Sequence, residues 1–430
     1  MDAATLRPET TEERIVWHCI VWTWFYWFLG ALYVLAPVLA WCLFAMVIRR
    51  IVRGESGWRR ERPPAGVVVW TIGMLAMLLA LVIAHLDWGL GAGLLIKSTI
   101  GWAKGWALMF VFPLAGAMLK IRASIVYRAT NKLALQTLCL VPIFIIAAFA
   151  NLPHPLYTSP LQIIGGPGPE YFAVELYGID DTNGAKRWRF FAPWSPAAAF
   201  VANIAFVFAL YDRSRFWKWI GIVCSIVVCL MSASRIALVV VPGVLGLTLV
   251  LSNLTRPVTA AAGAVTGTIG GFALPVILAF VEQLTDRFNA ARADSTRVRA
   301  YLRSIALHRW QTEAPLFGHG IVERGPKIVE HMPIGSHHTW YGLLYVKGAV
   351  GLLALAVPMA WTWCEMIIKA QADRVARAGL SVIIVISFYT FGENLEILAY
   401  LFWPGLVVIG IAMQRRFYSP YRQPLAGVEP

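Results

Sequence analysis

The sequence predicts an all-α, polytopic membrane protein, and three observations support this fold class. Hydrophobic residues make up 59% of the 430 residues and charged residues only 14%, against roughly 45–50% and about 25% in soluble domains. The apolar residues gather into long blocks, which a bilayer requires and a soluble core does not. Aromatic residues reach 13%, with 19 Trp, as is typical of proteins with two membrane interfaces. We therefore expect residues 1–430 to form a single integral membrane domain.

The apolar blocks predict about 12 transmembrane helices, each needing about 20 residues. The first block, 15–48, is long enough for two helices, and Gly30 and Pro37 lie near its middle. We divide it there, and a single tilted helix is the alternative. The remaining blocks are 65–86, 98–119, 133–151, 196–211, 216–232, 235–251, 257–282, 339–368, 379–393 and 396–413.

Positive charge predicts the orientation of these helices. Lys and Arg gather on every second connection, namely 49–64, 120–132, 212–218, 252–256, 369–377 and the C-terminal tail. The short connections on the opposite side hold a single Lys. Because positively charged short loops stay in the cytoplasm, we expect a multi-pass protein of a bacterial inner membrane with a cytoplasmic C-terminus. The N-terminal residues lack the features of a cleaved signal peptide, so the first block should be retained.

Two long connections fall on the predicted periplasmic side. The first, 152–195, is rich in Pro and Gly and ends in a basic aromatic stretch. The second, 283–338, holds eight Lys and Arg against five carboxylates, and five of the eight histidines of the chain. Long translocated loops largely escape the positive-inside rule, so this charge is permitted but not explained by topology. A membrane-surface substrate with negative charge would explain it.

His337 and His338 end this loop and are the candidate catalytic residues. A neutral imidazole at the membrane surface can act as a general base near pH 7. If a helix begins at His337, its side chain shares a face with Gly348 and Gly351, and these glycines would let another helix approach closely. The alternative is a pair of interfacial histidines without a role.

Arginines supply candidate sites for an anion. Arg235 stands at the outer mouth of an apolar span, where a charge usually faces a functional cavity, although it could also snorkel to the surface. Segment 296–310 has helical periodicity, with Arg299 and Arg303 one turn apart. These two can clamp a pyrophosphate or hold an amphipathic helix on the outer leaflet.

Several classes of protein are disfavoured by the motifs that the sequence lacks. It has no P-loop, no nucleotide-binding glycine fingerprint after a strand, no H-E-x-x-H and no D-x-D motif. All six cysteines lie in apolar blocks, so disulfides and zinc sites are unexpected. We therefore expect neither a nucleotide donor nor ATP-driven transport, and no metal or other cofactor.

Four segments resemble the O-antigen ligase family, within the wider group that includes O-antigen polymerases and protein O-oligosaccharyltransferases. The segments are RWRFFAPWSP at 187–196, SASRIAL at 232–238, APLFGHG at 314–320 and SHHTWYGLLYVKGAVG at 336–351. The resemblance covers roughly 187–351 and implies a GT-C-like glycosyltransferase fold. It implies donor-pyrophosphate contacts from Arg235, Arg189 and the loop arginines, among which Arg299, Arg297 and Arg303 all remain candidates. It also implies structural roles for Gly318, Gly320, Gly348 and Gly351.

Such proteins transfer a finished glycan from undecaprenyl pyrophosphate to a sugar hydroxyl of lipid A-core, in lipopolysaccharide biosynthesis, without metal or nucleotide. The resemblance thus implies an inverting enzyme whose active site lies in the loop 283–338. Its partners would be the lipid-linked glycan, the lipid A-core acceptor and membrane lipids, with no nucleic acid, and it would be a monomer. An O-antigen polymerase or protein O-oligosaccharyltransferase would use the same donor. A lipid or glycan transporter is the alternative of another class.

Overall fold

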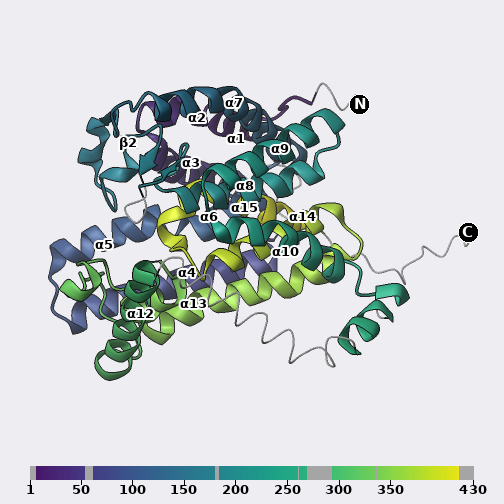
Figure 1. The fold of residues 1–430 in the computed structure, drawn as a ribbon. Coiled ribbons are helices and arrows are strands. Elements are labelled where there is room, and N and C mark those ends of the chain that lie inside the picture. Colours follow the sequence, from purple (N-terminus) through teal and green to yellow (C-terminus); the bar gives the residue numbers. More distant parts are fainter. Residues whose placement is uncertain are drawn as a thin grey trace, which may run out of the picture.

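The computed structural model describes residues 6–53, 62–179, 184–259, 261–268, 293–335 and 337–415, which form a bundle of long helices (Figure 1). The predicted span 257–282 lies mostly outside the described residues, as do parts of the connection 49–64 and of the C-terminal tail. The helices are α1 (Thr11–Val21), α2 (Thr23–Phe28), α3 (Leu32–Arg53), α4 (Ala65–Asp87), α5 (Ala92–Lys104), α6 (Leu108–Met118), α7 (Ala123–Phe149), α8 (Ser195–Tyr211), α9 (Arg215–Met231), α10 (Arg235–Leu251), α12 (Ala293–Glu313), α13 (Thr339–Ala370), α14 (Arg374–Tyr389) and α15 (Leu395–Gln414). Two antiparallel pairs of short strands lie in the first long loop: β1 (Tyr157–Thr158) with β2 (Ala173–Val174), and β3 (Gly178–Ile179) with β4 (Lys186–Arg187).

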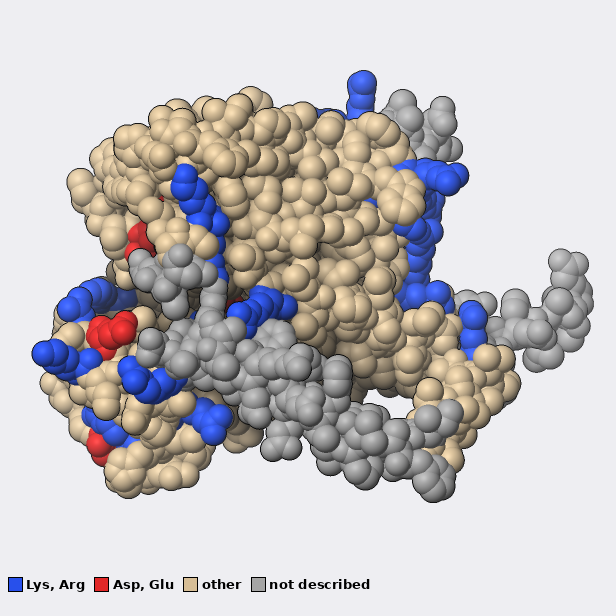
Figure 2. All heavy atoms as spheres, viewed as in Figure 1, with Lys and Arg blue, Asp and Glu red and all other residues tan. Residues whose placement is uncertain are grey.

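Six candidate membrane spans occur among the described residues, chosen by length and composition: Leu32–Arg53, Ala65–Asp87, Ala92–Met118, Ala123–Phe149, Thr339–Ala370 and Leu395–Gln414. Helices α8 and α10 are apolar but shorter. Figure 2 shows Lys and Arg gathered toward the two ends of the bundle, with a broad uncharged band between them. The chain is therefore a multi-pass membrane protein, as predicted, while the number of 12 spans stays a prediction.

The first apolar block is divided at Gly30, where the chain turns with a φ of +63°, whereas Pro37 lies inside α3. A single tilted helix is therefore wrong. Arg122 Nε donates to Glu13 Oε1 at 2.7 Å, and Arg50 pairs with Glu12. These ion pairs place the start of α1, the end of α3 and the start of α7 at one end of the bundle, in agreement with the alternation of basic connections.

The predicted connection 120–132 is mostly helix, because α7 begins at Ala123. Arg128 lies inside that helix and is buried, and its Nε and Nη2 donate to the two carboxylate oxygens of Asp212 at 2.9 and 2.8 Å. Asn131 Nδ2 donates to the same carboxylate at 3.0 Å. A buried charge is tolerated when its partner and hydrogen bonds are complete, so this basic residue does not mark a loop.

Helix α15 lies at the centre of the bundle and packs on α6, α14, α3 and α8. Its contact with α6 is between backbones, because a Cβ added to Gly116 or to Gly410 would overlap a carbonyl of the opposite helix. Small residues permit such close approach in membranes. The predicted span 98–119 is interrupted at 105–107, between α5 and α6. The described parts of the two long loops lie at the same end of the bundle, on the left in Figure 1.

Candidate active site

Helix α12 opens the described part of the second long loop and has two distinct faces. Val298 and Leu302 are buried against loop residues, whereas Arg299 and Arg303 lie on the exposed face, one turn apart. The helix confirms the predicted amphipathic segment. Tyr301, which the helical spacing predicts on the same side as Val298 and Leu302, is instead 42% exposed.

Arg309 and His319 fix α12 and its following loop to α13. Arg309 Nη1 donates to Tyr345 Oη at 2.6 Å and to Glu323 Oε2 at 2.7 Å. The buried His319 ring stacks on Tyr345, with ring centroids 4.4 Å apart, and contacts Glu313 Oε2 through Nε2 at 2.8 Å. Sequence analysis assigned these residues no role, and the only signal was their place in a loop rich in Arg and His.

Helix α13 is broken at Gly348, where φ is +62° and ψ is −162°, and segment 315–320 fills the break. Four backbone hydrogen bonds of 2.9 to 3.1 Å join them: Ala349 N to Pro315 O, Val350 N to Leu316 O, His319 N to Tyr345 O and Gly320 N to Val346 O. The amides of residues 349 and 350 would normally donate to the carbonyls of residues 345 and 346. The loop therefore satisfies the backbone groups that the break leaves open.

Glycine is needed at the predicted structural positions for different physical reasons. Gly318 and Gly348 both have positive φ, and a Cβ on either would overlap the backbone of the opposing segment. Gly320 also has positive φ, and its Cβ would lie 3.1 Å from His85 Nδ1. The expectation that Gly348 and Gly351 admit a neighbouring helix is wrong. The loop approaches Gly348, and the nearest neighbour of Gly351 is Lys347 of its own helix.

His337 and His338 precede α13, which begins at Thr339. His337 has a φ of +63°, so it turns the chain into the helix and its side chain does not follow the helical spacing to Gly348. His337 therefore does not share a helical face with Gly348 and Gly351, contrary to the prediction. His338 is the N-cap, with its Nδ1 accepting from Tyr341 N at 3.5 Å, and its ring lies 4.1 Å from that of Tyr341.

The start of α13 is held against the turn between α14 and α15. Thr339 N donates to Thr390 O at 3.0 Å, and Thr339 Oγ1 donates to Glu393 O at 2.6 Å. The same hydroxyl accepts from Leu395 N at 3.1 Å. Because Thr339 follows the two histidines directly, this turn sets where both imidazoles stand.

Two cavities meet at His337. The first, which we call the arginine cavity, has a volume of about 340 Å³ and is lined by Arg299, Ala300, Arg303, Gly335, His337, His338, Tyr341 and Phe391. The second, which we call the acidic cavity, has a volume of about 430 Å³. Its polar and aromatic lining is Trp106, Glu170, Tyr171, Trp194, His337, Thr339, Lys347, Glu393, Asn394 and Glu396. Of the residues that the structure describes, only Gly335 and His337 line both cavities.

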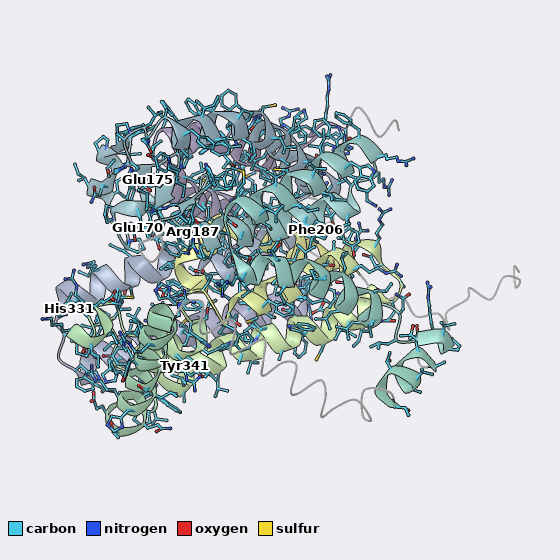
Figure 3. All side chains as sticks on the ribbon, viewed as in Figure 1. Glu170, Glu175, Arg187, Phe206, His331 and Tyr341 are labelled. Carbon is cyan, nitrogen blue, oxygen red and sulfur yellow. The ribbon has the colours of Figure 1, made fainter. Side chains whose placement is uncertain are left out.

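The described residues that line the two cavities carry different ionisable groups. The arginine cavity holds two guanidinium groups and no carboxylate, and Arg303 also lies 5.5 Å from the ring of Tyr341. The acidic cavity holds three carboxylates against the single Lys347. An anion is therefore favoured in the arginine cavity. Figure 3 shows Tyr341 beside α12 and Glu170 on the first long loop.

The other predicted arginines lie outside both cavities as the described residues define them. Arg297 is on the exposed side of α12, and Arg189 pairs with Glu175 at 2.8 Å. Arg235 is exposed at the first residue of α10. The next residue, Ile236, lies 3.5 Å from where a Cβ on Gly392 would be, so the start of α10 adjoins the turn that holds Glu393.

Glu393, Glu396 and Lys347 were not predicted as site residues. Glu393 is 5% exposed, and its Oε2 accepts from Trp194 Nε1 at 2.9 Å. In the sequence, the feature that could have indicated the site is a pair of glutamates that lie beside apolar spans, on the same side of the membrane as the long loops.

The described residues hold no cluster of three or more His, Cys, Asp or Glu side chains placed for a metal ion, and the expectation of no metal stays a prediction.

Burial shifts the pKa values of the groups around His337 in opposite directions. Desolvation, aided by Arg299, lowers the pKa of His337 to about 4. Desolvation, aided by Arg303, lowers that of His338 to about 4. Burial raises the pKa of Glu393 to about 7, although the hydrogen bond from Trp194 and the charge of Arg299 oppose this shift. The His337 imidazole is thus uncharged near pH 7 and can accept a proton.

We expect the pH dependence of chemical modification to reveal this shift. Diethyl pyrocarbonate reacts with neutral imidazole, so carbethoxylation of His337, followed by mass spectrometry, should be half-maximal near pH 4 rather than near 6.5. Replacing Arg299 with Gln removes a nearby positive charge and should move the midpoint upward. A midpoint near 6.5 in the unmodified chain would contradict the desolvated environment.

Comparison with known proteins gives one family match. Residues 220–356 match the family model described as O-antigen ligase, over less than half of the chain. The matched range contains Arg235, α12, the loop that docks on Gly348 and both histidines, but not Arg189 or Glu393. No curated protein matches the chain.

Proposed function

We propose that this chain, whose residues 220–356 belong to the O-antigen ligase family, transfers an O-antigen glycan from undecaprenyl pyrophosphate to a sugar hydroxyl of lipid A-core. The proposal includes an active site on the periplasmic face of a bacterial inner membrane, about 12 spans in a GT-C-like fold and a cytoplasmic C-terminus. The observation that carries it is His337, which stands on the wall shared by a positively charged cavity and an acidic one.

The arginine cavity is suited to the pyrophosphate of the donor. Arg299 and Arg303 are one turn apart on α12, and guanidinium groups bind phosphate oxygens through paired hydrogen bonds. In the transition state the bond between the anomeric carbon and the pyrophosphate oxygen breaks, and negative charge grows on that oxygen. Fixed positive charge at this point stabilises the transition state more than the bound donor.

His337 would act as the general base. Its neutral imidazole takes the proton of the acceptor hydroxyl as the oxygen bonds to the anomeric carbon and the pyrophosphate leaves with the electron pair of the broken bond. A single displacement of this kind inverts the anomeric centre. The pKa of about 4 describes the site without substrate. Phosphate charge bound beside Arg299 would raise that pKa toward the range in which a base works best.

His338 is less free for this task, because its ring already caps α13 and packs on Tyr341. Arg235 lies beside the turn that holds Gly392. At this position it would attract the donor pyrophosphate by long-range electrostatics rather than by direct contact. A monomer without metal or nucleotide is sufficient for this chemistry.

One assay separates the candidate functions. Purified protein in liposomes receives an undecaprenyl-pyrophosphate glycan with rough lipopolysaccharide, with an acceptor protein, or with no acceptor. Glycan on lipopolysaccharide alone supports the ligase. A ladder without acceptor indicates a polymerase, glycan on protein indicates an O-oligosaccharyltransferase, and movement across the bilayer without a new glycosidic bond indicates a transporter. Any result other than the first overturns the proposal.

A further inference from the structure

Lys347 is a buried cation whose ammonium has no bonding partner among the described residues. It is 4% exposed and lines the acidic cavity, yet no hydrogen bond or ion pair joins it to any described side chain or backbone group. Glu396 acts on it only through longer-range attraction. Lys369, on the same helix, bonds Glu365 Oε1 and Met413 O, each at 2.6 Å. A buried ammonium without hydrogen bonds is costly unless something else supplies them.

The remaining lining of the acidic cavity indicates what could supply those bonds. Three carboxyl groups and one ammonium line the cavity, so its lining offers both hydrogen-bond donors and acceptors. Trp106, Tyr171 and Trp194 add aromatic faces, on which the C–H faces of a sugar ring pack. Sugar hydroxyls both donate and accept hydrogen bonds, so one ring can satisfy an ammonium and carboxylates together. The cavity volume of about 430 Å³ lies within the usual range for small-ligand sites, roughly 300–1,000 Å³.

The hydrogen bonding of Glu393 also indicates a sugar as the ligand. Its Oε2 is bonded to Trp194, and among the described residues no hydrogen bond reaches its Oε1. The carboxylate and His337 line the same cavity, and Thr339 holds the backbone of Glu393 next to the histidine pair. A hydroxyl entering this cavity can therefore meet the ammonium, a carboxylate and the imidazole.

The direction of the displacement reaction decides which substrate the cavity serves. If the proposed function holds, on which this inference rests, the pyrophosphate leaves from the arginine cavity. The attacking oxygen must approach the anomeric carbon from the opposite side. The acidic cavity adjoins the arginine cavity, because Gly335 and His337 line both among the described residues, so a hydroxyl bound there lies beside the place where the donor is expected.

We propose that the acidic cavity is the acceptor site, and that it binds the uncharged terminal sugar of the acceptor. Lys347, Glu396 and Glu393 hydrogen-bond its hydroxyls, and the reacting hydroxyl faces His337. The cavity thereby selects a neutral sugar.

The first test separates acceptor from donor affinity by kinetics. Lys347→Met should raise the KM for rough lipopolysaccharide roughly 10- to 100-fold, as for a lost hydrogen bond to a charged group, and leave the KM for the lipid-linked glycan unchanged. Lys104→Met is the matched control, since Lys104 is not among the residues that line the cavity and, among the described residues, bonds the carbonyls of Ile164 and Gly165. An unchanged acceptor KM, or a raised donor KM, would overturn the proposal.

A second test does not depend on catalysis or on the fate of the Lys347 variant. Asn394→Cys places a thiol in the acidic cavity and Ala300→Cys places one in the arginine cavity. Labelling by a soluble maleimide is read by mass spectrometry at each position. Lipid-free core oligosaccharide should protect position 394 only, and undecaprenyl pyrophosphate position 300 only. Transfer activity without protection at 394 refutes the acceptor site alone, whereas an intact protein that makes no lipopolysaccharide product refutes the proposed function.

Discussion

Replacing His337 with Asn is expected to lower kcat for glycan transfer by roughly 10²- to 10⁴-fold, the usual contribution of a general base, while the protein folds normally. Asn is the suitable replacement because it tolerates the left-handed backbone that this position requires, with a φ of +63°. Ala would add backbone strain to the loss of the base. The amide cannot take the proton of the acceptor hydroxyl, so the loss should fall on kcat. The measurement is initial-rate kinetics with both substrates varied.

Two histidines provide controls for this experiment. His331 is exposed, also has a positive φ of 56°, and lies at the outer edge of the loop, away from Tyr341 (Figure 3). His331→Asn should therefore keep full activity. His338→Asn retains a residue that caps helices well, so we expect a much smaller loss than at His337. If His338→Asn removes as much activity as His337→Asn, the assignment of the base to His337 is wrong.

Local patterns predicted the parts of the site that depend on helical spacing. The helix α12 follows from the spacing of apolar residues, and this spacing also puts Arg299 and Arg303 on a different face from Val298. The same helical spacing predicted the orientation of the His337 side chain wrongly. A positive φ just before α13 breaks the extrapolation from His337 to Gly348, because a helical count holds only inside a continuous helix.

The acidic cavity could not be predicted from sequence, because its polar residues come from segments far apart in the chain. Lys347 is on α13, Glu396 on α15, Glu170 in the first long loop and Trp106 between α5 and α6. The neighbouring sequence shows that Lys347 has no acidic residue within four positions, unlike Lys369, which pairs with Glu365 four residues before it. Only the packing of these segments shows that Lys347 lines a cavity and that no described residue from another segment bonds its ammonium.

Replacing Gly348 with Ala is expected to destabilise the protein by roughly 2–5 kcal/mol, the sum of backbone strain and a steric clash. Gly348 has a φ of +62°, and an added Cβ would overlap Leu316 O. The docking of segment 315–320 would then be lost, together with the hydrogen bonds that fill the break in α13. Thermal unfolding in detergent measures the first effect, and faster proteolysis between residues 293 and 335 measures the second.

The matched control for this substitution is Gly246→Ala in α10, where an added Cβ would meet nothing within 4 Å. Ala is a better helix former than Gly, so this variant should melt at the same temperature as the unmodified protein or slightly higher. The Gly348 variant should also lose transfer activity below its melting temperature, because the loop that it displaces carries Arg299, Arg303 and His337. If Gly348→Ala melts like Gly246→Ala and keeps its activity, the docking of the loop on the break does not position the site.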